Sequence, residues 1–334
     1  MPRDAVAIAV VGATTLIGEE LVRLLGERKF PVGEIRLLGT TRTAGRKIDE
    51  VTVGLVGQSA FDGIDVAFFA AGPAVSGEHV GSALRAGAVV IDASSRFRLE
   101  DTVPLVVPEV NAALLTRAEP PRLVATPSST AVGLAVVLAP LVEAAGVRRV
   151  VVSTYQSAAG AGRRAVEYLS RESIALLSGR GEDDATQVRR AFNCIPQVGT
   201  VEIDGATTYE QAVADEVRKI LVQPDLAIHV TAVRVPMFFG VAASVAVELE
   251  RPLGLEAARE VLRDGRGILL HDDRETGAPT PADVIGSQAT HVGRVREDPT
   301  VPGGLALWIA LDSIEKGVAL NAVEIAEILI RRAS

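Results

Sequence analysis

The sequence predicts an α/β protein with two domains, and three observations support this. Apolar runs that suit buried strands alternate with helical patterns in the first third of the chain. A glycine-containing loop follows the first of these runs. After residue 127 the strands lengthen and one, at 228–236, alternates inward and outward residues, which is typical of a mixed or antiparallel sheet. With 48% hydrophobic but only 4% aromatic residues, the core is expected to be aliphatic.

The first third of the chain alternates strand and helix in regular order. Residues 5–12 (AVAIAVVG) form a continuous apolar run ending in glycine, as expected for a buried parallel strand. Residues 15–28 carry leucines at helical spacing. Further strands are predicted at 34–39, 65–72 and 88–94, with a helical stretch between the last two. Such alternation gives a parallel sheet with right-handed crossovers, so we predict a Rossmann-type doubly wound domain.

The rest of the chain is predicted to form an α+β domain with a mixed sheet. Strands are expected in RRVVVSTYQSAAG, AIHVTAVRVPMFFG and AASVAVELE, and helices at 161–178 and 209–222. The Pro/Gly-rich segment 277–287 is expected to be an exposed loop. A long amphipathic C-terminal helix is expected to pack back on the first domain. The two domains are predicted to comprise residues 1–127 with 314–334, and residues 128–313.

The loop GATTLIG at residues 12–18 joins the first strand to the first helix. Its two glycines permit a tight turn, and free N–H groups at a helix start can bind a pyrophosphate. Thr15 occupies the place of the middle glycine of the dinucleotide fingerprint, so the backbone is expected to approach the phosphates less closely. A plain strand-to-helix turn is the alternative. The candidate cofactor residues here are Gly12, Thr14, Thr15, Leu16, Ile17 and Gly18.

The end of the second strand bears on which cofactor this loop would take. No acidic residue stands there to bind a ribose 2′-hydroxyl; the sequence is GTTRTAGRK, residues 39–47. Arg42, together with Thr41 and Thr43, suits a 2′-phosphate, which favours NADP over NAD. A solvated basic loop is the alternative.

The segment RLVATPSSTAVGL reads as a strand, a tight turn and a helix. The turn presents Ser128, Ser129 and Thr130 at the helix start. A helix N-terminus is a common place for a nucleophile, but serine and threonine are also the usual N-cap residues. The residues alone leave both interpretations open.

Composition excludes several classes of function. The net charge of −8 argues against a nucleic-acid or anionic-membrane partner. The single cysteine, Cys194, excludes a disulfide framework and a cysteine-rich metal site, and we expect it to be buried. The four histidines are scattered without metal-ligand spacing, so no metal is expected. No apolar run reaches the roughly 18 residues that span a bilayer, and we expect a cytoplasmic protein.

Several long segments together resemble the aspartate-semialdehyde dehydrogenase family. They extend from residue 6 to about 330 and occur in that family's order: AVVIDASSRFR, VPLVVPEVN, VVSTYQSAAGAG, AFNCIPQVG, VTAVRVPMFFG, VGRVRED and KGVALNAVEIAEIL. The resemblance implies a homodimer, or a dimer of such dimers. It assigns dinucleotide binding to the first domain and catalysis and dimerisation to the second. It is closest to the Usg-type paralogues of the family, which lack the catalytic cysteine.

The family reductively dephosphorylates aspartyl phosphate to aspartate semialdehyde with NADPH. The resemblance implies a cysteine that forms a thioester and a histidine that moves protons. When the family motif is aligned backwards from Pro140 and Leu141 without a gap, the position of its cysteine falls on Ser129. Ser128 is the alternative register. The histidine position is Val241. A serine hydroxyl needs a neighbouring base, which valine cannot provide.

Other implied site residues survive. By resemblance, Arg98 binds substrate phosphate, Gln156 positions the acyl group, and Arg234 pairs with the substrate carboxylate with Glu210 nearby. Structural ion pairs of the two arginines are the alternative interpretation. The resemblance also places a group of residues at the cofactor, namely Ala71, Gly72 and Ser313.

Three further positions depart from the family pattern: Ala93 stands where the family usually has asparagine, Ala212 where it has a lysine near the phosphate, and Ser313 where it has asparagine. The sequence therefore predicts a member of this fold that lacks the family's reaction and retains parts of the nucleotide and anion pockets, with NADP binding weak or lost. The alternative is an active NADP-dependent oxidoreductase that acts on an aldehyde or acyl substrate by non-cysteine chemistry.

Overall fold

The computed structural model describes residues 5–180, 188–272 and 277–332. The chain divides into two compact units. Unit 1 comprises Met1–Ser128, Lys219–Leu221 and Gly317–Ser334, and unit 2 comprises Ser129–Arg218 and Val222–Lys316. The sequence placed these divisions at 127/128 and 313/314.

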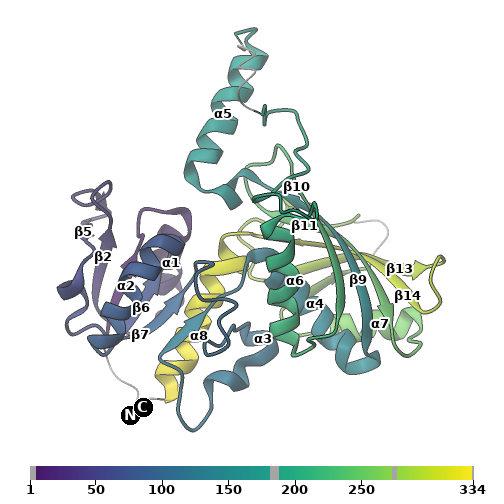
Figure 1. Ribbon diagram of the computed structural model, residues 1–334, viewed down its shortest axis with the longest axis horizontal. Coiled ribbons are helices and arrows are strands. Elements are labelled where there is room, and N and C mark those ends of the chain that lie inside the picture. The colour runs from purple at the N-terminus through teal and green to yellow at the C-terminus, as the bar shows by residue number, and fades with distance from the viewer. Residues whose placement is uncertain (1–4, 181–187, 273–276, 333–334) are drawn as a thin grey trace. The chain divides into compact units, whose positions relative to one another are not determined.

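Unit 1 is built on a six-stranded sheet in which every pairing is parallel (Figure 1). In spatial order its strands are β5 (Gly54–Leu55), β2 (Val32–Gly39), β1 (Val6–Val11), β6 (Val66–Phe69), β7 (Val89–Asp92) and β8 (Leu123–Ala125). A small antiparallel pair lies apart from this sheet, formed by β3 (Lys47–Ile48) and β4 (Val51–Thr52). The strand order reverses its direction next to β1, which confirms the predicted doubly wound domain.

Helices cover both faces of this sheet because successive β1 side chains point to opposite sides. Val10 packs with leucines of α1 (Leu16–Glu27) and with the apolar face of α8 (Leu320–Arg332). Val11 packs instead with α2 (Pro73–Arg85). Arg28 holds α8 by a bond of 2.7 Å from its Nε to Glu327. The remaining short helices are α3 (Pro108–Asn111), η1 (Gln58–Phe61) and η2 (Ala112–Leu115).

Unit 2 is built on a six-stranded mixed sheet, as predicted. In spatial order its strands are β10 (Ala227–Arg234), β9 (Val147–Gln156), β11 (Val241–Leu249), β14 (Gly304–Leu311), β13 (Thr290–Asp298) and β12 (Ile268–His271). The two outer pairs, β10–β9 and β12–β13, are parallel, and the inner pairings are antiparallel. The helices are α4 (Ser129–Ala145), η3 (Ala158–Ala161), α5 (Arg163–Leu177) and α7 (Leu255–Arg263), with α6 (Thr208–Leu221) as far as Arg218 and the π-helical η4 (Glu315–Ala319) as far as Lys316.

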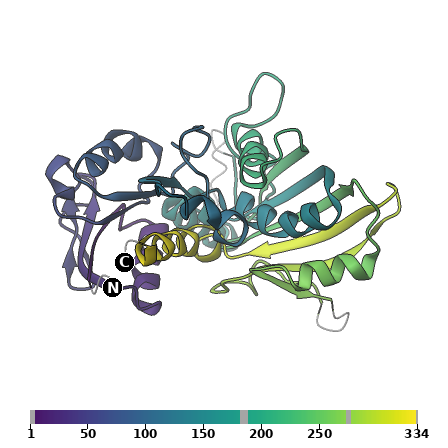
Figure 2. The same ribbon diagram turned by 90° about the horizontal axis from the view of Figure 1, so that it is seen from below.

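The two faces of this second sheet are covered differently. On one face lies α4, where Gly133 sits so close to Leu311 that a Cβ would come within 2.8 Å of its side chain. On the other face Ala242 and Ala310 pack with Val284 of the segment 277–287. That segment is a loop and most of its residues are exposed, as expected, but Val284 departs from the expectation because it is fully buried. Figure 2 shows both sheets from a second direction.

Candidate functional site

The loop between β1 and α1 turns tightly at Gly12. The φ of Gly12 is +86°, and a Cβ there would come within 2.7 Å of the backbone nitrogen of Ala71. A Cβ on Gly18 would lie 2.2 Å from the carbonyl oxygen of Gly12. Neither position has room for a side chain, so the first turn of α1 lies directly against the end of β1.

Thr15 acts as the N-cap of α1. Its hydroxyl accepts a hydrogen bond from the N–H of Gly18 at 3.0 Å and donates one to the carbonyl of Ala70 at 3.2 Å. The cap occupies one of the N–H groups that an open helix start would offer a phosphate. Three further loop residues are only half-buried around it, namely Thr14, Leu16 and Ile17.

Arg42 lies beyond the end of β2 in a short loop. It is exposed, and its guanidinium has no hydrogen bond or ion pair with the described residues. Thr41 beside it is exposed too, whereas the Thr43 hydroxyl turns back to the carbonyl of Thr40 at 3.4 Å. Arg42 and Thr41 are therefore accessible to an anion, and Thr43 is not oriented for one.

A second loop lies next to Gly12 and contains Ala71 and Gly72. Gly72 has a φ of +94° and precedes α2, which begins with Pro73. The described structure shows no side chain that caps α2. Unit 1 thus brings together the glycine loop and the start of α2, as expected of two neighbouring strand-to-helix turns in a parallel sheet.

Arg98 of unit 1 lies on a loop that Asp92 organises. The buried Asp92 carboxylate accepts bonds from the hydroxyls of Ser76 at 2.6 Å and Ser94 at 2.7 Å. Burial raises the pKa of Asp92, while these hydroxyls and nearby Arg98 lower it. The Arg98 guanidinium donates to the carbonyls of Thr126 at 2.9 Å and Ala93 at 3.1 Å. These bonds use part of the donor set that the sequence assigned to a phosphate.

Ser129 is the first residue of α4 and is only half-buried. Its hydroxyl has no hydrogen-bond partner among the residues that the structure describes. A serine becomes nucleophilic when a base lies within hydrogen-bond distance, so this hydroxyl is not activated by the protein around it. Neither does the structure show the Ser129 side chain capping the helix.

Gln156 lies close to the start of α4. Its amide donates to the hydroxyl of Thr130 at 2.8 Å and to that of Thr154 at 3.2 Å. The Thr130 hydroxyl also contacts the Tyr209 hydroxyl at 2.9 Å. These side chains come from α4, β9 and α6, and they hold the residue after Ser129 in place.

Val241 begins β11 and is 1% exposed. It pairs in register with Gln156 on one side and Leu311 on the other. The structure therefore places the expected histidine position beside Gln156, and a hydrocarbon side chain fills it. No proton acceptor can act from there.

Arg234 ends β10 and lines a cavity of about 420 Å³ in unit 2. It donates to the carbonyl of Ser157 at 2.6 Å, and no carboxylate pairs with it in the described chain. Burial lowers the pKa of Arg234, and the neighbouring cation of Arg190 lowers it further. Arg190 also lines the cavity. The ion pair that the alternative interpretation required is absent from the described residues, and an anion would offset both unfavourable effects.

Glu210 is engaged by the backbone. Its carboxylate accepts from the N–H of Thr207 at 2.7 Å while the Thr207 hydroxyl accepts from the Glu210 N–H at 3.2 Å, which is a capping box at the start of α6. The other carboxylate oxygen accepts from the N–H of Ala232 at 2.7 Å, on the outer side of β10. Glu210 thus fixes α6 to the sheet edge, near Arg234.

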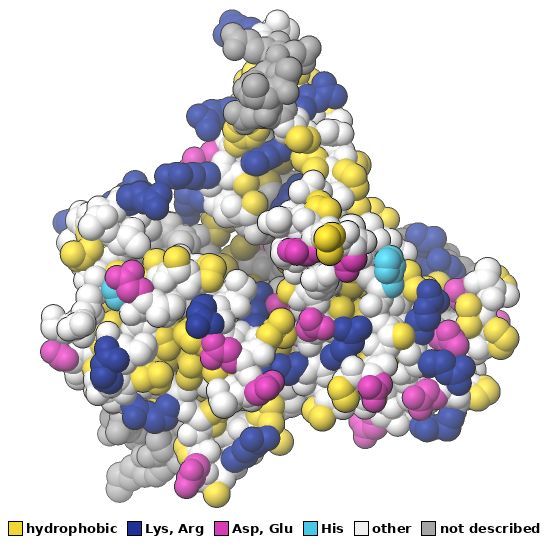
Figure 3. Space-filling view, in the orientation of Figure 1, with side chains coloured by type: hydrophobic (Ala, Val, Ile, Leu, Met, Phe, Trp, Pro, Cys, Tyr) yellow, Lys and Arg dark blue, Asp and Glu magenta, His cyan; other side chains and the backbone are white. Residues whose placement is uncertain are grey.

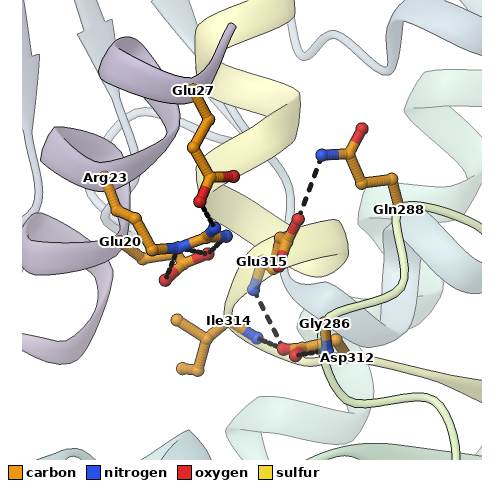
Figure 4. A network of polar contacts seen from close by, with 8 residues as sticks. All are labelled: Glu20, Arg23, Glu27, Gly286, Gln288, Asp312, Ile314 and Glu315. Atoms are coloured by element: carbon orange, nitrogen blue, oxygen red, sulfur yellow. Dashed lines mark hydrogen bonds and ion pairs between the residues drawn. The ribbon is translucent and has the colours of Figure 1, made fainter.

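Ser313 follows the end of β14 and is buried, and its hydroxyl has no partner in the described structure. Asp312 before it is fully engaged. Its carboxylate accepts from the N–H groups of Gly286 at 3.0 Å, Ile314 at 2.8 Å and Glu315 at 2.9 Å (Figure 4). The strand end is therefore held rigidly, and Ser313 contributes a free hydroxyl.

Comparison with known proteins agrees with both units. A family model described as semialdehyde dehydrogenase, NAD binding domain, matches residues 7–118, and one described as semialdehyde dehydrogenase, dimerisation domain, matches residues 138–316. The aspartate-semialdehyde dehydrogenase of Aquifex aeolicus is 37% identical over 332 residues, with 97% of this chain and 98% of that protein covered. The chain belongs to the aspartate-semialdehyde dehydrogenase family.

Further relatives give the same picture. The enzyme of this name from Prochlorococcus marinus is 39% identical, with 99% of this chain and 98% of that protein covered. The crystal structure of aspartate semialdehyde dehydrogenase II from Vibrio cholerae complexed with ASA is 36% identical, with a TM-score of 0.91 and 98% coverage of both chains. The family resemblance read from the sequence is confirmed.

Sequence reasoning missed three side chains of the candidate site in this family member. The sequence shows Thr130 only as one of three hydroxyls at a helix start, with no partner, and it gives no sign of Tyr209. Their contact joins residues 79 positions apart, which no local pattern reveals. Arg190 follows another arginine in a polar stretch and reads as a solvated residue. Only the fold brings it to the Arg234 cavity.

The remaining expectations concern Cys194, metal ions and membranes. Cys194 is exposed, so the expectation of a buried cysteine is wrong. Among the described residues, no cluster of His, Cys, Asp and Glu side chains could hold a metal ion. The described helices include none that is long and apolar enough to cross a membrane.

Figure 3 shows that basic and acidic side chains are distributed over the face of the molecule in view.

Proposed function

We propose that this protein binds NADP and a small carboxylate but does not carry out the family's reductive dephosphorylation, as a non-catalytic paralogue of the Usg type. The observation that carries the proposal is the unpartnered Ser129 hydroxyl together with the buried Val241. The covalent mechanism needs both a strong nucleophile and a base, and these positions supply neither. The loss of the Lys position at Ala212 supports the same conclusion.

The cofactor proposal rests on unit 1. Gly12 and Gly18 let the first turn of α1 lie directly against the end of β1, which supports pyrophosphate binding at the helix start, and Arg42 is a free cation beyond β2. The Thr15 cap removes one phosphate donor, so we expect NADPH to bind in the micromolar range or more weakly. Residues 1–127 with 314–334 are proposed as the dinucleotide-binding domain.

Replacing Arg42 by alanine is expected to weaken NADPH binding roughly 10- to 100-fold, because a charge-assisted hydrogen bond to the 2′-phosphate contributes about 1.5–3 kcal/mol. NADH has no such phosphate and is the matched control, so its affinity should hardly change. Fluorescence titration of both nucleotides checks this. A wild-type preference for NADH would contradict the assignment of Arg42.

The carboxylate proposal rests on Arg234 and its cavity in unit 2. Arg234→Ala is expected to weaken binding of L-aspartate, measured by calorimetry, roughly 10- to 100-fold. Arg234→Lys should recover only part of this affinity, because lysine cannot form the bidentate pair. If both variants bind aspartate as well as the wild type, Arg234 is not the carboxylate site.

The assembly and the alternative activity follow from the same features. A family model described as a dimerisation domain matches residues 138–316, which supports a homodimer. Residues 128–313 are proposed as its substrate and dimerisation domain. Analytical sedimentation would measure the mass of the assembly.

The retained Gln156 and Arg234 favour a second candidate function, an oxidoreductase that acts on an aldehyde or acyl substrate without a cysteine. Turnover within a hundredfold of an authentic family enzyme, abolished by Ser129→Ala, would establish that candidate and overturn the first.

A further inference from the structure

A chain of three side chains lies outside the candidate site, in the second half of unit 2. The hydroxyl of Ser287 lies 2.7 Å from Nε2 of His291 on β13. Nδ1 of His291 lies 2.9 Å from Nε2 of His271 on β12. The two imidazoles are inclined by only 22°, with centroids 5.1 Å apart, so this contact lies close to the ring planes. The sequence showed scattered histidines, and the parallel β12–β13 pairing brings two of them together.

The side chains of Ser287, His291 and His271 are separated from Ser129 and Val241 by the sheet itself. Val241 is in register with Leu311, whose side chain contacts α4 on one face. His291 is in register with Ala310, the next residue along β14, which packs with Val284 on the opposite face. Neighbouring residues of a strand point to opposite faces, so His291 cannot serve as a base for Ser129.

The hydrogen bonds around Ser287 allow its proton to move toward His291. The N–H of Ala289 donates to the Ser287 oxygen at 3.3 Å, which leaves the hydroxyl proton free to point at His291 Nε2. In the matching tautomers His291 Nδ1 carries the other proton and donates it to His271. This is the order of nucleophile, base and orienting group found in serine hydrolases.

The loop around Ser287 is anchored on both sides. Before it, the N–H of Gly286 donates to Asp312 at 3.0 Å, and after it, the side-chain amide of Gln288 donates to Glu315 at 3.1 Å (Figure 4). The backbone N–H of Gln288 has no acceptor within the described structure. The N–H of the residue after a serine nucleophile is a standard donor to an oxyanion.

We propose that Ser287, His291 and His271 form a second reactive centre that accepts acyl groups from small activated esters. The Ser287 oxygen attacks the ester carbonyl while its proton passes to His291 Nε2, and the Gln288 N–H binds the oxyanion. The carbonyl–oxygen bond to the alcohol then breaks, and the alcohol leaves with the proton from His291. Water attacks the resulting serine ester by the same route and releases the carboxylic acid.

The substrate class follows from the chemistry of His271, the third of these side chains. A carboxylate in that place stabilises the charged imidazolium by its negative charge, whereas His271 offers only a lone pair. The centre therefore suits aryl esters, whose leaving groups need little assistance, rather than amides. Burial lowers the pKa of His291, and the neighbouring His271 lowers it further, which keeps the base neutral near pH 7. Ser287 is half-buried and reachable by a small acyl group.

The first experiment is labelling of the full-length protein with an alkyl fluorophosphonate. The Ser287 oxygen–phosphorus bond forms, the phosphorus–fluorine bond breaks, and mass spectrometry locates the adduct. Labelling and p-nitrophenyl acetate hydrolysis are expected to fall at least about 100-fold in Ser287→Ala and in His291→Gln. Ser244→Ala removes an exposed serine on β11 and should match the wild type. An unlabelled wild type, or an adduct on another serine, overturns the proposal.

A second variant separates chemistry from loss of local structure. The thiol of Ser287→Cys is expected to react with iodoacetamide at pH 7 at least about tenfold faster than the exposed Cys194 of the same molecule, because His291 promotes the thiolate. Adding His291→Gln should remove the difference. Equal rates for the two thiols would show that His291 does not activate position 287.

Discussion

Purified wild-type protein is expected to reduce NADP with aspartate semialdehyde and phosphate at least about ten thousand times more slowly than an authentic family enzyme. Removing a nucleophile or its base typically costs about four to six orders of magnitude in rate, and this chain has serine and valine at the two positions that the family resemblance assigns to them. The Ser129 hydroxyl has no base beside it among the described residues, and Val241 is a buried hydrocarbon. Absorbance at 340 nm over a long incubation measures the rate.

Restoring both groups sharpens this expectation. Ser129→Cys combined with Val241→His is expected to raise turnover at least about 100-fold above the wild type. The thiol would stand at the first residue of α4, where the helix dipole lowers a thiol pKa, and β11 would place the imidazole beside Gln156. The double variant should stay below an authentic enzyme, because Ala212 still lacks the lysine of the family.

The single variants are the controls for this experiment. Each is expected to remain within about tenfold of the wild type, because nucleophile and base act as a unit and are strongly non-additive. High activity in Ser129→Cys alone would show that another base serves position 129. Loss of wild-type activity in Ser129→Ala would show that the serine already reacts, which contradicts the proposed function.

Gly18→Ala is expected to destabilise unit 1 by about 3 kcal/mol or more and to abolish nucleotide binding. The new Cβ would lie 2.2 Å from the carbonyl oxygen of Gly12, which is backbone and cannot rotate away. Helix α1 must then move off the end of β1, and overpacking of this kind typically costs about 1–3 kcal/mol even where side chains can yield. Urea unfolding and NADPH titration measure the two effects.

Gly26→Ala is the matched control on the same helix. A Cβ at this exposed position would meet no atom within 4 Å from outside its own helix, among the residues that the structure describes. Alanine is expected to stabilise the protein by about 0.5–1 kcal/mol, because it restricts the unfolded chain without strain. The same substitution eight residues away should therefore change the unfolding midpoint in the opposite direction. Equal effects of both changes would refute the steric argument.

The fold was largely accessible from the sequence because hydrophobic periodicity reports burial directly. Continuous apolar runs such as 5–12 became the buried parallel strands of unit 1, and alternation in 228–236 became the half-exposed edge strand β10. The C-terminal helix begins later than expected, at Leu320, after a π-helical turn. Helix ends depend on capping and tertiary contacts, which apolar spacing does not encode.

The candidate site was less accessible, because contacts between distant residues decide it. The sequence could assign Ser129 and Val241 through motif order, but it could not show that Val241 adjoins Gln156 across a strand pair. It could not show that Thr15 closes the helix start, that backbone carbonyls engage Arg98, or that Arg190 shares a cavity with Arg234. Each depends on side-chain direction after folding.

The position of Glu210 also affects the tendency of this protein to aggregate. Strand β10 is the outermost strand of its sheet, and an open strand edge invites pairing with another chain and so aggregation. The Glu210 carboxylate occupies the N–H of Ala232, and Ile195 pairs with Arg234 on the same side. These contacts occupy the N–H groups of Ala232 and Arg234 on the open side of the strand. A glutamate that the family resemblance assigns to the substrate therefore has a reason to be retained even where no substrate is turned over.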